Sequence, residues 1–260
     1  MNTTSSDGTT IAFDRLGSGP AVVLVQGAFT DRTHPTWAGL AEILKSKYTV
    51  YNYDRRGRGE SGDTPPYSVD REVEDLEAII KEAGGSAAVV GGSSGAGLAL
   101  RAAARGLSIT KLVLWEPPYH VGDARPPLPD DFEQQLSGLV AEDRRGDAAV
   151  LFMTAAADIP DEMAAEMRGA PYWPEVERVA HTLSYEIAVM GPGNKMPAEL
   201  KDITVPTLVL TGGDSAPWMG VAAKAVSETV PGGKLGVLAG QTHEVDHAVL
   251  APAVDEFLAS

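Results

Sequence analysis

The chain has 260 residues, with 36 acidic against 21 basic side chains and a formal net charge of -15. A surface this acidic repels phosphate backbones and anionic lipids, so we expect neither a nucleic-acid partner nor a membrane partner. The chain has no cysteine, which excludes disulfides, a thiolate nucleophile and cysteine metal ligands.

The first residues, MNTTSSDGTT, show no targeting signal, because a signal peptide needs a basic region followed by an apolar run. No apolar run approaches the roughly 20 residues that span a bilayer. We therefore expect a soluble, cytoplasmic protein that acts on a small molecule, with no cofactor and no metal, and a homodimer is one possible assembly. The histidines lack the HExxH spacing of a zinc site; they are His34, His120, His181, His243 and His247.

Short apolar runs bounded by Gly, Pro or Asp recur along the chain and predict strands. The runs are continuous and rich in β-branched residues, which is typical of strands covered on both faces of a parallel sheet. They are AVVLVQ (21–26), YTVYNYD (48–54), AAVVGG (87–92), KLVLWE (111–116), TLVLTGG (207–213) and KLGVLAG (234–240).

Helical patterns lie between these runs. Residues 69–82 place aliphatic side chains on one helical face and acids on the other. Residues 94–105 predict an Ala- and Leu-rich helix, and residues 246–258 predict a helix that closes the chain. Strands alternating with helices predict an α/β fold with a mostly parallel sheet flanked by helices.

Residues 117–203 interrupt this alternation, because they contain no strand pattern. A segment of this length is no plain crossover, and we expect its helices to be too few for a core of their own. The interpretation is a helical lid over the carboxyl edge of a core made of residues 1–116 and 204–260. After a Pro-rich linker, its amphipathic helices are expected around 131–144, 147–157, 160–168 and 174–190.

A candidate nucleophile stands in GGSSG (91–95), which fits G-x-S-x-G between a predicted strand and a predicted helix. That context is typical of a nucleophile elbow, where small neighbours permit a sharp, strained turn. The frame places Ser93 at the centre, since centring on Ser94 would require glycine at position 96, where alanine stands. The Ser94 N–H, at the start of the helix, can then face a developing oxyanion.

A serine hydroxyl needs a nearby base to act as a nucleophile at neutral pH. His243, in LAGQTHEVD, is the best candidate because it follows the last predicted strand and emerges at the same carboxyl edge as Ser93. We interpret the other histidines as ordinary structural or surface residues.

Several motifs together carry a resemblance to a known family. They are the order of Ser93 and His243, the GGSSGAG elbow, YDRRGRGES (53–61), VLVQGAFTDR (23–32) and the interrupted sheet. On these motifs the chain resembles the α/β-hydrolase superfamily over essentially its whole length. The resemblance implies a lid inserted after the sixth strand and an oxyanion donor at the N–H of Ala28. The family usually has His-Gly in that loop, and Gln26 replaces the histidine here, which we expect to change how the loop is held.

The carboxylate that would orient the histidine has two candidates. Most of the family places it after the seventh strand in Gly-x-x-Asp, but here Ser215 occupies that place and Asp214 falls one residue short. Glu116 ends the strand beside the nucleophile, an arrangement similar to zearalenone-lactone hydrolases and some haloalkane dehalogenases. A lone glutamate is costly to bury at a strand end. We therefore expect Glu116 to be the acid, with Asp214 as the alternative.

The resemblance implies a serine hydrolase of carboxylic esters or lactones. We expect Phe29, Trp173 and Trp218 to contact an apolar substrate between the lid and the sheet. Two alternatives stay open. One is perhydrolysis, C–C bond cleavage or lyase chemistry on the same fold without a cofactor, and the other is a ligand-binding protein without catalysis.

Overall fold

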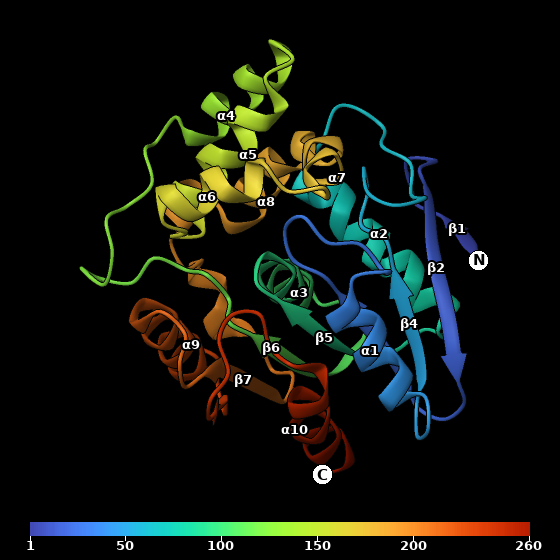
Figure 1. The fold of residues 1–260 in the computed structure, drawn as a ribbon. Helices are drawn as coiled ribbons and strands as arrows, with labels where there is room; N and C mark the ends of the chain where they lie inside the picture. The colour runs from blue at the N-terminus through green and yellow to red at the C-terminus, as the bar shows by residue number, and fades with distance from the viewer.

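One twisted sheet organises the chain, and the computed structural model describes all of residues 1–260 (Figure 1). The strands are β1 (Asn2–Thr4), β2 (Thr10–Gly17), β3 (Ala21–Val25), β4 (Thr49–Tyr53), β5 (Ala87–Gly92), β6 (Ile109–Trp115), β7 (Thr207–Gly212) and β8 (Lys234–Leu238). Their order across the sheet is β1-β2-β4-β3-β5-β6-β7-β8. β2 pairs antiparallel with β1 and β4, and all other neighbours are parallel.

The predicted α/β fold with a mostly parallel sheet is confirmed, and each apolar run coincides with a strand, although β6 begins two residues before its run. The pattern of continuous apolar runs does not predict β1 and β2. In β2, Ile11 and Phe13 are buried, whereas Asp14 and Arg15 are exposed. This strand lies near the edge of the sheet, where polar side chains reach water and interrupt the apolar run.

Helices cover both faces of the sheet (Figure 1). On one face, α1 (Pro35–Leu44) and α10 (His247–Ala259) share a hydrophobic cluster with the strands. On the other face, α2 (Val69–Glu82), α3 (Ser94–Ala104) and α9 (Pro217–Thr229) contribute to a second, larger cluster. No helix combines the length and the apolar character that crossing a membrane requires.

The helix α2 shows how the local sequence defines an element. The Ser68 hydroxyl accepts a hydrogen bond from the N–H of Arg71 and so caps the first turn. Asp70 and Glu72 lie in that turn, where the helix dipole favours negative charge. The aliphatic face is buried against the sheet. The helix begins and ends at the predicted residues, 69 and 82.

A helical insertion, residues 117–203, lies between β6 and β7 and above the sheet in Figure 1. Its only β-type pairing is an isolated bridge between His120 and Lys195. A short π-helical segment (Phe152–Ala156) extends the second of its helices, and 3₁₀ turns follow at 180–182, 192–194 and 198–202. The α-helices of the insertion are α4 (Phe132–Ala141), α5 (Arg145–Leu151), α6 (Asp161–Arg168), α7 (Trp173–Arg178) and α8 (Leu183–Met190).

The insertion has a hydrophobic core of its own, so the expectation that its helices are too few was wrong. A cluster of 14 buried side chains, including Phe132 and Leu136, lies within residues 128–187. The predicted helix at 174–190 is divided into α7 and α8, and the turn between them contributes Ala180 to the cluster. Ala28 and Phe29, from the loop after β3, pack against it. The insertion is therefore tied to the sheet next to that loop.

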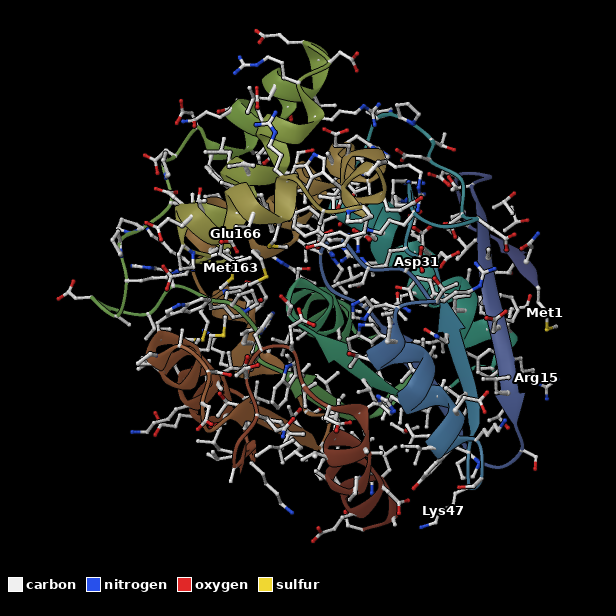
Figure 2. All side chains as sticks on the ribbon, in the orientation of Figure 1. Met1, Arg15, Asp31, Lys47, Met163 and Glu166 are labelled. Atoms are coloured by element: carbon white, nitrogen blue, oxygen red, sulfur yellow. The ribbon has the colours of Figure 1, made fainter.

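The helix α6 lies on the outside of the insertion. Met163 and Glu166 lie on α6, on the side of the molecule away from Met1 (Figure 2). Met163 is 52% exposed. Only Ala164 of this helix is buried, so α6 covers the core of the insertion from outside.

The three arginines that follow β4 are buried, which is rare for charged side chains. Arg55, Arg56 and Arg58 are each at most 1% exposed. Arg56 donates two hydrogen bonds of 2.7 Å to the carboxylate of Asp75 on α2. This bidentate ion pair joins the loop after β4 to helix α2 on one face of the sheet. It also neutralises two charges that are buried from water.

We expect Asp75→Ala to lower the free energy of unfolding by about 3–5 kcal/mol, because it removes the buried carboxylate that accepts two hydrogen bonds from the guanidinium of Arg56. Urea unfolding followed by circular dichroism measures the change. Glu77→Ala, on the same helix, is the matched control. It removes an ion pair with Lys81, whose side chain is 65% exposed, and should cost less than about 1 kcal/mol. Equal losses in the two variants would contradict the role given to the buried pair.

Candidate active site

Ser93 occupies a sharp turn between β5 and α3. Its backbone angles, φ 54° and ψ −127°, lie in a region that residues with a side chain rarely adopt. A Cβ on Gly91 would lie 2.7 Å from the carbonyl oxygen of Gly95, and a Cβ on Gly95 would overlap the carbonyl oxygens of Val25 and Gln26. The glycines of GGSSG are thus needed for the turn to pack against the loop after β3.

The loop after β3 lies directly beside Ser93. A Cβ on Gly27 would be only 2.8 Å from Cβ of Ser93 and 3.5 Å from its hydroxyl oxygen. The N–H groups of Ala28 and Ser94 make no hydrogen bond within the protein. Both N–H groups can therefore donate to a further acceptor.

Gln26, which stands where the family usually has histidine, is fully buried. Its side-chain amide donates to the side-chain oxygen of Asn52 on β4. Asn52 in turn donates to the carbonyl oxygen of Arg32 at 2.8 Å. This chain of amides connects β4 with both ends of the loop and leaves the backbone at Ala28 unobstructed.

His243 lies in the loop between β8 and α10, and its ring meets Glu116. The distance from Nδ1 of His243 to Oε2 of Glu116 is 2.7 Å. The indole N–H of Trp115 donates to the carbonyl oxygen of His243 at 3.0 Å and holds this loop against the end of β6. The His243 side chain is 34% exposed and that of Glu116 is 0% exposed. The ring therefore connects a buried carboxylate to more open space.

Both carboxylate oxygens of Glu116 accept hydrogen bonds although the residue is buried. Its second oxygen accepts hydrogen bonds from the Thr211 hydroxyl at 2.9 Å and the Gly212 N–H at 2.8 Å. Burial alone raises the pKa of Glu116, but the hydrogen bonds from His243 and Gly212 outweigh it and hold this pKa below its usual value. A charged carboxylate accepts the proton on Nδ1, which leaves Nε2 of His243 as an acceptor.

Asp214, the alternative acid, lies apart from the histidine. It is exposed, and its N–H donates to the carbonyl oxygen of Gln241 at 2.9 Å. Its carboxylate makes no hydrogen bond to His243, whose Nδ1 is occupied by Glu116. The position one residue short of the usual aspartate thus directs this side chain to solvent.

Ser93 and His243 line the same cavity between the sheet and the insertion. The two side chains are not hydrogen-bonded to each other, and such contacts often tighten only when substrate binds. The cavity has a volume of about 40 Å³, and since about 10–15 Å³ holds one water, the space suits a small group. The other lining residues are Ser94, Pro118, Phe152, Ala156, Ala157, Glu186, Ile187, Met190, Asn194, Trp218 and Met219.

The aromatic residues expected to contact substrate have three different outcomes. Trp218, at the start of α9, lines the cavity. Phe29 does not line it, but packs edge to face on Phe152, which does, with 5.5 Å between the ring centres. The expectation for Trp173 is corrected, because this residue does not line the cavity. It is buried in the core of the insertion, where its indole N–H donates to Glu177 at 2.9 Å. The orientation of a helix within the insertion depends on packing that the local sequence does not reveal.

Sequence reasoning missed the polar residues of the cavity wall. Glu186 on α8 and Asn194, which follows it, both line the cavity and are buried. The available signal was an acidic residue within the apolar stretch LSYEIAVM (183–190), because a buried acid requires a partner. Its partners, Arg55 and Arg58, lie more than a hundred residues earlier and could not be paired with it by spacing.

The described residues offer no ready metal site. No group of three or more histidine, aspartate or glutamate side chains lies close enough together to hold a metal ion.

Comparison with known proteins gives matches over the whole fold. A family model described as "Alpha/beta hydrolase family" matches residues 22–257. An alpha/beta hydrolase from Sphaerobacter thermophilus, solved by crystallography, is 52% identical with a TM-score of 0.93, covering 99% of this chain and 100% of that chain. The crystal structure of the enol-lactonase from Burkholderia xenovorans is 19% identical with a TM-score of 0.74, covering 100% of both chains; at this identity the likeness concerns the fold.

Among curated proteins, the N-formylmaleamate deformylase of Pseudomonas putida is 34% identical over 140 residues. The match covers 50% of this chain and 51% of that protein, so it spans about half the length of this curated relative. The family model, by contrast, extends from β3 through the insertion to α10. Since it includes the turn at Ser93, the end of β6 and the loop of His243, this chain belongs to the alpha/beta hydrolase family.

Proposed function

We propose that this protein is a serine hydrolase of carboxylic esters or lactones. The observation that carries the proposal is the 2.7 Å contact between His243 and the buried Glu116, at a cavity that Ser93 also lines. A carboxylate buried for structural reasons alone needs no histidine held at the rim of a cavity. A hydroxyl, an imidazole and a carboxylate in this order form the relay that acyl transfer uses.

In the proposed mechanism, the Ser93 oxygen attacks the acyl carbon while Nε2 of His243 takes the hydroxyl proton. Glu116 keeps the ring in the required tautomer and stabilises the imidazolium. The imidazolium then gives its proton to the leaving alkoxide, and the acyl group stays on Ser93. Water, deprotonated by His243, attacks the acyl-enzyme. As the second tetrahedral intermediate collapses, the bond to the Ser93 oxygen breaks, the imidazolium returns its proton to that oxygen, and the acid is released.

In the proposed mechanism, the N–H groups of Ala28 and Ser94 donate hydrogen bonds to the negatively charged oxygen of the tetrahedral intermediate. Neither group has a partner within the protein, so neither must break a hydrogen bond when the charge develops. Donors that are in place before the reaction stabilise the transition state without reorganisation. The close approach of Gly27 to Ser93 brings the first of these donors to the nucleophile.

The cavity favours a small, largely apolar acyl group. Its size leaves room for only a few atoms, and Ile187, Trp218 and Met219 contribute apolar walls. The deformylase to which the chain is similar over half its length supports hydrolytic acyl transfer, although its name describes a formyl group on nitrogen. We further propose that the helical insertion acts as a lid, with substrate bound between it and the sheet.

We expect Ser93→Ala to lower kcat for a short p-nitrophenyl ester by about 10⁴-fold or more, because it removes the nucleophile. The same variant should lose covalent labelling by a fluorophosphonate probe. Ser94→Ala is the matched control, since it keeps the backbone N–H, and should retain labelling. Turnover by Ser93→Ala would overturn the mechanism. A folded native protein that is neither labelled nor active would support a ligand-binding role instead.

Replacing the proposed acid should separate the two carboxylates. We expect Glu116→Gln to lower kcat about 10²–10⁴-fold with little change in KM, because the neutral amide no longer stabilises the imidazolium. Asp214→Asn, at the exposed alternative position, should leave kcat within about twofold. Steady-state kinetics on both variants makes the comparison, and the reverse pattern would assign the acid to Asp214.

A further inference from the structure

A buried ionic cluster lies immediately behind the loop at Ala28. The guanidinium of Arg58 donates to the carbonyl oxygens of Gly27 and, at 3.3 Å, Thr30. The same guanidinium forms an ion pair with Glu186 of α8. Arg58 and Glu186 are each 1% exposed, so bulk water has little access to these contacts.

Arg55 also contacts this loop, at the carbonyl group of the residue before Gly27. It donates to the carbonyl oxygen of Gln26 at 3.2 Å and to Glu186 at 2.8 Å. Its Nε donates to Glu72 of α2 at 2.6 Å, and Glu72 also accepts the Tyr67 hydroxyl at 2.7 Å. Glu186 thus forms ion pairs with two arginines that hold two successive carbonyl groups of the loop.

The carbonyl of Gly27 belongs to the peptide whose N–H is that of Ala28. Because a peptide is planar and its C=O and N–H point in opposite directions, a donor that holds the oxygen also sets the direction of the N–H. A charged donor on the oxygen polarises the peptide and strengthens the N–H as a donor. The Thr30 hydroxyl, at 2.9 Å from the same oxygen, adds to this restraint.

Glu186 is the one member of the cluster that comes from the insertion. It also lines the cavity that contains Ser93 and His243. Ala28 itself packs against the hydrophobic core of the insertion. The position of α8 and the position of the loop are therefore connected both by charge and by apolar contact.

We propose that Arg58 and Glu186 are positioning residues that hold the Gly27–Ala28 peptide in the orientation needed to stabilise an oxyanion beside Ser93. The inference rests on the proposed function for its catalytic meaning. In this arrangement Arg58 acts through the backbone and Glu186 acts through Arg58, and neither touches the reacting atoms. The orientation of the Gly27–Ala28 peptide then depends on the position of the insertion, because Glu186 of α8 supplies the charge that keeps Arg58 in place.

The principal test is Arg58→Lys, with Glu186→Gln as a second variant that breaks the same pair from the insertion side. Lysine keeps the charge but has no planar fork, so it cannot bind the Gly27 carbonyl and Glu186 as the guanidinium does. We expect kcat for a short p-nitrophenyl ester to fall about 10–100-fold in both variants. For Arg58→Lys, KM should stay within about threefold, because Arg58 does not line the cavity.

Arg56→Lys is the matched control. This residue is equally buried and lies in the same stretch, but it contacts Asp75, Asp7 and the Arg71 carbonyl rather than the loop at Ala28. It should lower the melting temperature and leave kcat of the folded protein within about twofold. If Arg58→Lys lowers stability but spares kcat as Arg56→Lys does, the cluster is structural only and the inference is wrong.

Crystal structures of Glu186→Gln and Arg56→Lys give a readout that needs no activity. We expect the Gly27–Ala28 peptide to rotate or shift in the first variant and to keep its orientation in the second. An unchanged peptide in Glu186→Gln would overturn the inference even if the native enzyme is active. Failure of the proposed function would look different: native protein without turnover or labelling at Ser93, whatever the peptide does.

Discussion

The burial of the Glu116 carboxylate constrains the rest of the site. A charge removed from water must find hydrogen-bond donors within reach, and here they come from separate parts of the chain: Thr211 and Gly212 on β7, and His243 in the loop after β8. These donors meet because the carboxyl ends of parallel strands share one edge of the sheet. Satisfying one acid therefore also orients the ring proposed as the base.

The same rule explains how the insertion is joined to the sheet. Arg55 and Arg58 could not remain buried without carboxylates, and Glu186 supplies one from α8 while Glu72 supplies another from α2. Apolar contacts join the two parts as well, because Val189 and Met190 of α8 belong to the hydrophobic cluster that covers one face of the sheet. The ion pairs add a polar link at Glu186, which also lines the cavity that contains Ser93.

Two departures from the usual family pattern preserve the backbone geometry. Gln26 replaces a histidine, and its side-chain amide donates a hydrogen bond to Asn52 on β4. The loop after β7 does not supply the acid at Asp214; instead, its Gly212 N–H donates to the acid that β6 supplies. In both cases the hydrogen bonds around the altered side chain are made within the protein.

The sequence by itself determined the fold class, because buried parallel strands leave continuous apolar runs and the turn at Ser93 requires closely spaced glycines. It also ranked Glu116 above Asp214 from the position of each relative to a strand end. Only the tertiary structure decided that Trp173 packs inside the insertion, that Glu186 pairs with Arg58, and which residues line the cavity. The physical reason is range: strand and turn patterns depend on neighbours along the chain, whereas helix orientation and charge pairing depend on residues brought together only by folding.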